Sequence, residues 1–292
     1  MTAQLVFVHG RAQEHKDSIA LKAEWIGAWR EGLGKSGLTV PIPETSIRFP
    51  YFGQTLYDLV AQADQVAEVV IRGTADDAER RFQQAVLAEV QTELKITDEE
   101  VEALLAREVV ERGPLNWEWM QGILKAIDRR VPGGSAASIA LSTRDVYQYL
   151  RNPGVREPIE QGVRKALSAQ VPTVVVSHSL GTVVAFNLLK REGEQQGWNV
   201  PLFVTVGSPL AITAIRAALT PLEHPACVTK WFNAMDERDV VALYPLKKPH
   251  FDIDPAIENK TDVRNKTDNR HGIAGYLDDK VVAARIHQAL SE

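Results

Sequence analysis

The sequence predicts an α/β protein in which a mostly parallel sheet carries helices on both faces, together with a helical insertion. Apolar runs rich in β-branched residues alternate with stretches of helical periodicity near the start of the chain, and the alternation returns in its second half. Between these parts, residues 58–130 are rich in helix-forming residues and poor in strand signals. The 292 residues fit one domain, so we expect a single α/β domain over 1–292 with an insertion at 58–130.

Composition and charge are ordinary for a soluble globular protein, with 45% hydrophobic and 24% charged residues. The net charge of -5 gives no reason to expect nucleic acid as a partner. No run of about 18 apolar residues occurs, the N-terminus lacks a basic leader, and Cys227 has no second cysteine with which to pair. We therefore expect a cytoplasmic protein without an integral membrane segment, whose oligomeric state the sequence leaves open.

The first elements predict a parallel sheet. The apolar run Gln4–Val8 indicates a buried strand, and helical spacing over 17–33 indicates a helix after it. Two short strand pieces are expected at 38–41 and 46–49, around a proline-rich turn. A strand, a helix and a strand in this order are typical of a βαβ unit, whose strands are parallel.

The insertion at 58–130 is predicted to consist of helices. Thr97 and Glu100 form a capping-box pattern that opens a helix, which we expect to end near Gly113. Asn116 is expected to cap a second helix. These helices either cover the sheet or form a cap that closes over a site, and the sequence leaves both interpretations open.

The second half of the chain returns to α/β alternation. A loop at 131–135 precedes helical patterning over 143–169, which breaks near Pro153. The expected strands are 173–176, 202–206 and 227–232, and the expected helices are 181–190 and 276–290.

Ser179 lies where a buried strand meets an amphipathic helix, in the segment Val174–Thr182. A serine at the tip of such a turn has an exposed Oγ, and the crowded turn requires small residues two positions before and after it. Ser177 and Gly181 meet this requirement, although glycine is usual at both positions. The pattern predicts that Ser179 is a nucleophile and that the backbone N–H of Leu180, at the helix N-terminus, is a donor to an oxyanion. A chance match of so short a motif is the alternative.

His9, Gly10 and Arg11 follow the first strand. In enzymes that carry a serine on a strand–turn–helix, an early loop supplies the second oxyanion donor through a backbone N–H. Gly10 lets the backbone approach a substrate closely, and we expect the donor to be the N–H of Arg11. The alternative is that Gly10 only turns the chain and that His9 is a core histidine or a neighbour of the site.

A serine nucleophile needs a base, and enzymes of this kind recurrently place a histidine after the serine and the acid in the chain. Four histidines follow Ser179. His287 falls in the predicted last helix, and His224 precedes a strand, at the wrong end of the sheet. His271 lies in a polar loop before the last helix, so we predict that it is the base, with His250 as the alternative.

The acid that orients the base is expected after the strand at 227–232, where Asp236 and Asp239 lie. Such an acid must be partly buried and held by hydrogen bonds. Asp239 precedes the apolar pair Val240-Val241 and is therefore expected to point inward, whereas Asp236 can cap the turn. We predict Asp239 as the acid, with Asp236 as the alternative acid.

Taken together, these segments resemble the lipase and esterase branch of the α/β-hydrolase superfamily. The matching pieces are Phe7–Gly10, Ser177–Thr182, Val206–Leu210, Trp231–Asn233 with Asp236 and Asp239, and His271 with Tyr276. A Ser-His-Ser-Leu-Gly elbow followed by Gly-Ser-Pro is common in lipase-like members, including those similar to the inositol deacylases of lipid anchors. The resemblance covers about 1–12 and 173–277 and leaves out 58–130. It favours Asp239, because an aspartate followed by an apolar pair is usually the acid in such lipases.

The resemblance implies an α/β-hydrolase-type fold and a serine hydrolase that cleaves carboxylic esters through an acyl-enzyme on Ser179. The expected substrate is a small-molecule ester or a lipid. We expect no cofactor or metal, since no cluster of His, Cys and Asp has ligand spacing. Aromatic residues of the insertion, such as Trp117 and Trp119, either favour an apolar acyl group or pack the insertion onto the sheet. The alternative function is a non-catalytic or effector-type protein of this fold that binds a small molecule or a partner.

Overall fold

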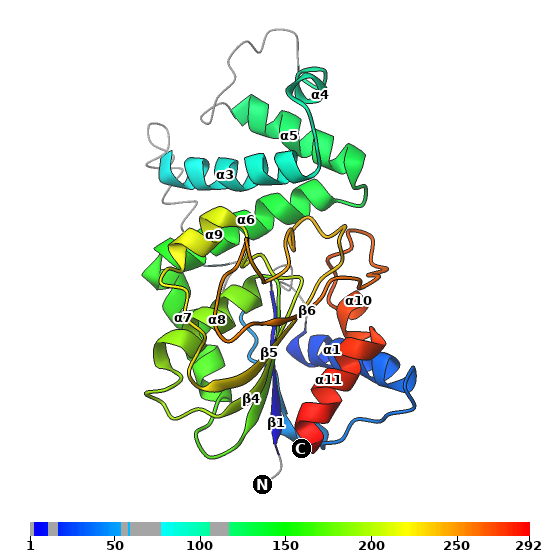
Figure 1. Ribbon diagram of the computed structural model, residues 1–292, viewed down its shortest axis with the longest axis vertical. Coiled ribbons are helices and arrows are strands. Elements are labelled where there is room, and N and C mark those ends of the chain that lie inside the picture. The colour runs from blue at the N-terminus through cyan, green and yellow to red at the C-terminus, as the bar shows by residue number, and fades with distance from the viewer. Residues whose placement is uncertain (1–2, 11–16, 54–57, 59–76, 106–116) are drawn as a thin grey trace.

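The computed structural model describes residues 3–10, 17–53, 58, 77–105 and 117–292, and these contain a six-stranded sheet (Figure 1). The strands are β1 (Gln4–Val8), β2 (Ile47–Arg48), β3 (Thr173–His178), β4 (Val200–Val206), β5 (Val228–Ala234) and β6 (Glu258–Lys260). They lie in the order β2-β1-β3-β4-β5-β6, and every neighbouring pair is parallel. The predicted α/β fold with a parallel sheet is confirmed, and it is compatible with the α/β-hydrolase type.

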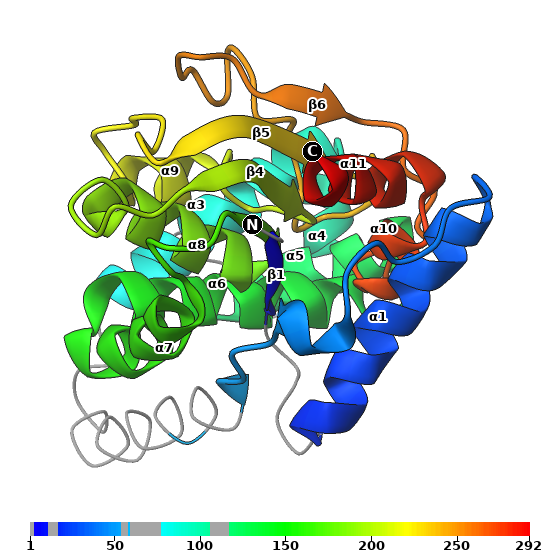
Figure 2. The ribbon, with the colours of Figure 1, turned by 90° about the horizontal axis from the view of Figure 1, so that it is seen from below.

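Helices cover both faces of the sheet (Figure 2). One face carries α1 (Ser18–Gly34), α10 (Ala274–Leu277) and α11 (Lys280–Ser291), and the other carries α6 (Ser135–Arg151), α7 (Pro153–Ala166), α8 (Leu180–Glu192) and α9 (Thr213–Ala218). Successive side chains of a strand point to opposite faces. Leu5 and Phe7 of β1 therefore pack with Trp25 of α1, whereas Val6 and Val8 join the hydrophobic cluster on the other face.

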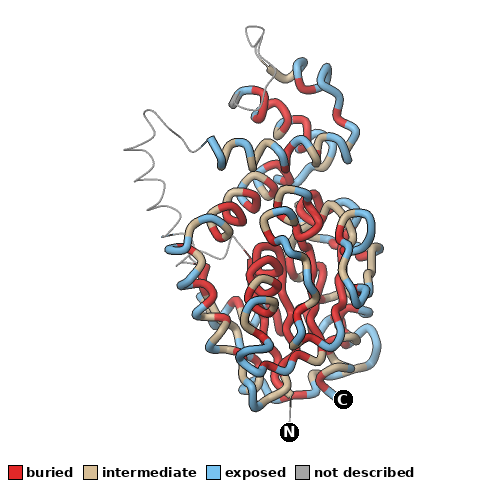
Figure 3. The backbone as a smooth tube through the Cα atoms, turned by 60° about the vertical axis from the view of Figure 1, so that its left-hand side comes forward, coloured by how far each residue is buried: buried red, intermediate tan, exposed pale blue. Residues whose placement is uncertain are grey.

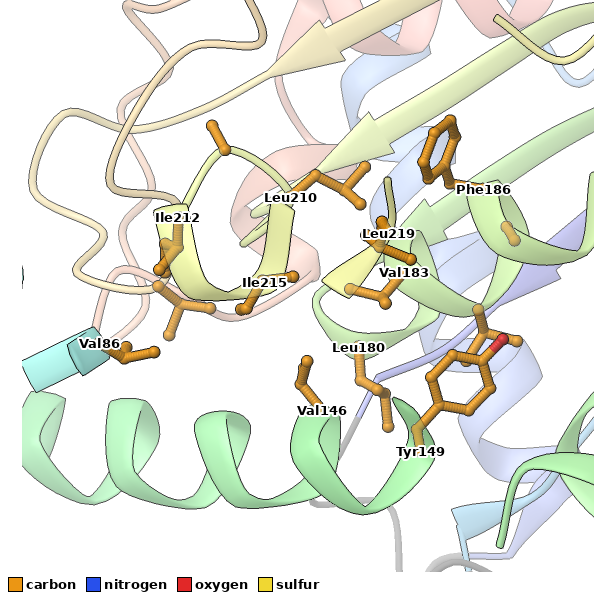
Figure 4. Packing of buried hydrophobic residues seen from close by; sticks show 14 of the residues in the cluster. Val86, Val146, Tyr149, Leu180, Val183, Phe186, Leu210, Ile212, Ile215 and Leu219 are labelled. Atoms are coloured by element: carbon orange, nitrogen blue, oxygen red, sulfur yellow. The ribbon is translucent and has the colours of Figure 1, made fainter. Parts of the chain in front are cut away.

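The insertion forms α3 (Asp77–Glu93), α4 (Asp98–Glu102) and α5 (Trp117–Arg130), which lie beyond the carboxyl ends of the strands, at the top of Figure 1. Helix α3 packs on α6 and α9, where Val86 shares one hydrophobic cluster with Val146 and Ile215 (Figure 4). The Glu89 carboxylate accepts hydrogen bonds from the N–H and the hydroxyl of Thr213, each at 3.0 Å. The buried sides of these helices are continuous with the buried interior below them (Figure 3).

Residues 38–41 form no strand, so this prediction is wrong. The N–H of Leu38 is already used, because it donates to the carbonyl oxygen of Leu33 at the end of α1, at 3.0 Å. Pro41 and Pro43 have no N–H to donate to a strand ladder. The chain instead passes through the short 3-10 helix η1 (Glu44–Ser46) before it joins the sheet as β2.

The helix that opens at Thr97 is shorter than predicted. Its capping box is present, with reciprocal hydrogen bonds between Thr97 and Glu100, but the helix ends at Glu102. The N–H of Ala103 bonds two carbonyls of the preceding turn, which tightens that turn and closes the helix. The expected end at Gly113 and the expected cap Asn116 lie outside the described residues.

The expected C-terminal helix is two helices, α10 and α11. They are separated because Asp279 caps α11, with its carboxylate accepting from the N–H groups of Val281 at 2.8 Å and Val282 at 3.2 Å. Besides η1, the short helix α9 and the edge strand β6 were not predicted.

Gly32 of α1 lies where this helix meets α10 and α11. A Cβ there would lie 2.4 Å from the carbonyl oxygen of Leu277 and 2.7 Å from the Cβ of Ala283. We expect Gly32→Ala to lower the free energy of unfolding by roughly 1–3 kcal/mol, as overpacking does. Gly27→Ala is the matched control in the same helix, since nothing lies within 4 Å of the added Cβ, and it should instead stabilise the protein. Urea unfolding measures both changes, and equal effects of the two substitutions would contradict this packing.

Candidate active site

Strand β3 runs into α8 through a sharp turn with Ser179 at its tip. Ser179 has φ 54° and ψ -129°, a backbone conformation that favours glycine. Holding another residue in such a region costs on the order of 1–3 kcal/mol. Gly181 is required in this turn, because a Cβ there would lie 2.3 Å from the carbonyl oxygen of Val8. The predicted strand, turn and helix around Ser179 are therefore present, with the serine in a strained conformation.

Ser177 fits at a position where glycine is usual because its hydroxyl turns toward the neighbouring strand. Its Oγ is buried and donates to the carbonyl oxygen of Val204 at 3.0 Å. On the helix side of the turn, Thr182 Oγ1 donates to the carbonyl oxygen of Ser179 at 2.7 Å and lies 2.8 Å from Ser208 Oγ. A hydroxyl has a single proton, so Ser208 is the donor in that pair. These buried hydrogen bonds fix both ends of the turn.

His271 joins Ser179 to a buried carboxylate. Its Nε2 lies 2.8 Å from Ser179 Oγ, and its Nδ1 lies 2.7 Å from Asp239 Oδ2. A carboxylate only accepts hydrogen bonds, so Nδ1 carries the proton and Nε2 can accept from the serine hydroxyl. The structure thus brings the predicted serine, histidine and aspartate into one hydrogen-bonded chain.

The Asp239 carboxylate is completely buried and receives four hydrogen bonds. Oδ1 accepts from the N–H groups of Val241 at 2.9 Å and Ala242 at 3.3 Å, and Oδ2 accepts from His271 and from the Tyr276 hydroxyl at 2.6 Å. Burial alone would raise the pKa of Asp239, but His271 and these donors outweigh it and hold the pKa below its usual value. The acid beside His271 is therefore ionised at neutral pH.

Asp236, the alternative acid, contacts a different group. Its Oδ2 accepts from the N–H of Asn265 and its Oδ1 from the N–H of Arg238, both at 2.8 Å. Asn265 begins the segment that carries His271, which we call the base loop (Asn265–Gly272), and its side chain closes the loop by donating to the carbonyl oxygen of Gly272 at 2.8 Å. The two aspartates after β5 thus have different tasks: one contacts the imidazole, and the other anchors its loop.

Asn269 ties the base loop to the helices beneath the insertion. Its Oδ1 accepts from the N–H of His271 at 3.1 Å, and its Nδ2 donates to Ser138 Oγ on α6 at 2.8 Å. Gly133, between α5 and α6, lies so close to the loop that a Cβ would come 2.1 Å from the carbonyl oxygen of Asp268. The position of the imidazole therefore depends on the region at which the insertion joins the domain.

His178 precedes the serine and was not singled out by the sequence. Its Nε2 lies 2.7 Å from the carbonyl oxygen of His271, and the two rings are 4.7 Å apart. Burial, reinforced by the nearby His271, lowers the pKa of His178 to about 3, so the ring is neutral. A carbonyl only accepts, which makes Nε2 the donor. The only sequence signal was its position beside Ser179.

His9 and Gly10 lie against the serine turn. His9 Nδ1 donates to the carbonyl oxygen of Gly10 at 2.7 Å, its Nε2 accepts from the N–H of Phe52 at 2.9 Å, and burial lowers its pKa to about 4. A Cβ on Gly10 would lie 2.6 Å from the Cβ of Ser179, so glycine at this position lets the end of β1 pack against the serine turn. Leu180 is the first residue of α8, where an N–H has no acceptor within the helix. Arg11 lies outside the described residues.

The other late histidines are engaged elsewhere. His250, the alternative base, stacks on the ring of Tyr244 with centroids 3.7 Å apart. His224 packs edge-on against Trp231, and His287 lies in α11. His271 is thus the late histidine that contacts Ser179.

The described residues contain no group of three or more His, Cys, Asp or Glu side chains able to hold a metal ion, and no helix among them is both long and apolar enough to span a bilayer. The chain matches no protein-family model, no curated protein and no solved structure.

The strain at Ser179 predicts an inverted order of stability for two substitutions. At most positions alanine gives a more stable protein than glycine, because glycine has more conformational freedom to lose. Here both substitutions remove the hydroxyl, but only glycine relieves the positive φ. We expect the unfolding free energy of the Ser179→Gly variant, measured by urea titration, to be about 1 kcal/mol higher than that of the Ser179→Ala variant. A more stable alanine variant would show that the turn is unstrained.

The two buried neutral histidines predict a loss of stability in acid. In the unfolded chain His9 and His178 bind protons near pH 6.5, whereas the folded forms do so only near pH 4 and 3. The unfolded state therefore binds more protons as the pH falls below 6.5. Near pH 5 we expect each histidine to lower the unfolding free energy by about 1.4 kcal/mol for every unit by which the pH is decreased. Urea titrations of His9→Gln and His178→Gln should each show roughly half of this extra slope, and an unchanged slope would contradict the burial of neutral rings.

Proposed function

We propose that this protein is a serine hydrolase that cleaves carboxylic esters through an acyl-enzyme on Ser179. The observation that carries the proposal is the hydrogen-bonded chain from Ser179 Oγ through both nitrogens of His271 to Asp239, at 2.8 and 2.7 Å. Nucleophilic catalysis by serine requires such a base and such an orienting acid. The parallel sheet and the serine turn add support to the resemblance to the lipase and esterase branch of the α/β-hydrolases.

In the first half of the reaction, Ser179 Oγ attacks the ester carbonyl carbon while His271 Nε2 takes the hydroxyl proton. The carbonyl oxygen becomes an oxyanion. When the tetrahedral intermediate collapses, the bond to the leaving oxygen breaks, and His271 returns the proton to the departing alcohol. In the second half His271 takes a proton from water, whose oxygen attacks the acyl carbon, and the carboxylic acid leaves as Ser179 regains its proton.

Asp239 and the turn supply the electrostatics of this reaction. Asp239 holds His271 with Nδ1 protonated and stabilises the imidazolium that forms in each half-reaction, while its four donors keep it ionised. The N–H groups of Leu180 and Arg11 are the proposed oxyanion donors, with Gly10 allowing the substrate to approach. No step of this scheme calls for a cofactor.

The proposed substrate is a small-molecule ester or a lipid. The proposed location of the protein is the cytoplasm. Ser179 is only 3% exposed, and this burial supports a site that is covered rather than open at the surface. The insertion lies beyond the carboxyl ends of the strands, the same end as Ser179, and this placement supports a role as a cap (Figure 1). Helix α3 of the insertion packs onto α6 and α9, and this packing favours a cap that stays in contact with the rest of the domain.

A binding protein of this fold without catalysis is the alternative function. Such a protein has no need for a serine hydroxyl within hydrogen-bond reach of an imidazole that is itself held by a carboxylate. The 2.8 Å contact between Ser179 and His271 therefore favours the hydrolase.

Hydrolysis of p-nitrophenyl esters from acetate to palmitate tests the proposal. We expect wild-type turnover, and a loss of at least about 10⁴-fold in kcat for Ser179→Ala, because the residual rate of an enzyme without its nucleophile comes only from binding and oxyanion stabilisation. The ester length at which kcat/KM peaks separates a small-ester enzyme from a lipase.

Ser142→Ala is the matched control, since it removes another buried serine hydroxyl, on α6. It should retain turnover. Tight binding of an ester without turnover by the wild-type protein would favour the binding protein, and turnover by Ser179→Ala at the wild-type rate would remove Ser179 from the reaction.

A further inference from the structure

Tyr276 contacts the same carboxylate oxygen as the catalytic imidazole. It is the third residue of α10, completely buried, and its hydroxyl lies 2.6 Å from Asp239 Oδ2. His271 Nδ1 lies 2.7 Å from that same oxygen. Two side-chain donors therefore share Oδ2. The other carboxylate oxygen, Oδ1, accepts from two backbone N–H groups.

The direction of the tyrosine hydroxyl is fixed. The N–H of Asp236 lies 3.4 Å from Tyr276 Oη and can only donate, so the single phenolic proton is left for Asp239. Burial, together with the nearby Asp239 charge, raises the pKa of Tyr276 well above its usual value. The phenol consequently stays protonated and remains a donor near neutral pH.

The ring of Tyr276 has little room to turn away. It lies against Gly207 at the end of β4, where a Cβ would come 3.1 Å from Tyr276 Cε2. Its centroid is 6.2 Å from that of His178, the ring that holds the backbone of His271. The completely buried ring is thus held beside Asp239 by its neighbours.

Sharing an oxygen has a chemical consequence. Each donor withdraws negative charge from Oδ2, so the Tyr276 hydroxyl weakens the attraction between Asp239 and a protonated His271. We propose that Tyr276 is a positioning residue that lowers the basicity of His271 by holding part of the charge of Asp239 through their shared carboxylate oxygen. The role in turnover rests on the proposed hydrolase function, whereas the effect on the imidazole does not.

Other charged or titratable groups also face these three residues. They are Asp236 with its ion-pair partners Arg238 at 3.8 Å and Arg270 at 4.0 Å, the neutral His178, and Ser179. Replacing the Tyr276 hydroxyl leaves each of these groups in place, so a change in the titration of His271 would report the lost hydroxyl.

The test is Tyr276→Phe, which keeps the ring and removes the donor. We expect the protonation midpoint of His271, followed by ¹⁵N NMR of the imidazole nitrogens, to rise by about half a unit to one unit, the size expected for one partly shared hydrogen bond to a charge. The acid limb of the kcat/KM profile for p-nitrophenyl acetate should move by the same amount. Site-specific replacement of Tyr276 by 3-fluorotyrosine, a stronger donor that keeps the hydroxyl, should move both midpoints in the opposite direction.

Tyr149→Phe is the matched control. Tyr149 is also completely buried and donates to a carboxylate, Glu160 Oε1, at 2.7 Å, but away from the candidate site. It should lose stability without moving the His271 midpoint. An unchanged midpoint in both Tyr276 variants would overturn the proposal and leave Tyr276 with a packing role. If the wild-type protein hydrolyses no ester, the hydrolase proposal fails, and the NMR titration still decides the effect of Tyr276.

Discussion

The candidate site depends on a backbone contact between the end of β1 and the turn after β3 that leaves no room for a side chain. A Cβ on Gly181 would lie 2.3 Å from the carbonyl oxygen of Val8, and a Cβ on Gly10 would lie 2.6 Å from the Cβ of Ser179. At this contact the chain passes through Ser179 with a positive φ, and the hydrogen bond to His271 holds the serine hydroxyl at the carboxyl edge of the sheet. The strain is sustained by the completely buried strands on either side.

The parallel sheet then determines what can meet that hydroxyl. The carboxyl ends of parallel strands share one edge, so the segments after β3 and β5 converge there. After β5, Asp239 reaches the imidazole, while Asp236 holds the N–H of Asn265 and thereby the base loop. The neutral His178 holds the backbone of the same loop. Buried polar groups are costly when they are left without a partner, and these hydrogen bonds both reduce that cost and fix the geometry of the site.

The sequence contained enough information to predict the parallel α/β fold and the residues that now lie together as Ser179, Asp239 and His271. Each of these three residues has a local signal: a strand followed by a helix, an apolar pair after an acid, and a polar loop before the last helix. The choice between Asp239 and Asp236 rested on the expected inward direction of Asp239, and the contact with His271 agrees with it.

The rest of the site could not be read from local patterns. Tyr276 contacts Asp239, and His178 contacts the backbone of His271, so both partners are distant in the sequence. No local pattern around Tyr276 or His178 indicates these partners. Strand β6 has the polar sequence Glu-Asn-Lys and no apolar alternation. It joins the sheet partly through Asn259, whose side chain bonds Asn233 of β5 at 2.9 Å and the N–H of Leu246 at 2.8 Å.

The most direct test of the central claim is to find where a fluorophosphonate reacts. Peptide mass spectrometry after labelling should locate one phosphonyl adduct on the peptide that contains Ser179, with labelling lost in Ser179→Ala and strongly slowed in His271→Gln. An adduct on a different serine, or no adduct on a folded wild-type protein, would contradict the account of Ser179 as a nucleophile activated by His271 and Asp239.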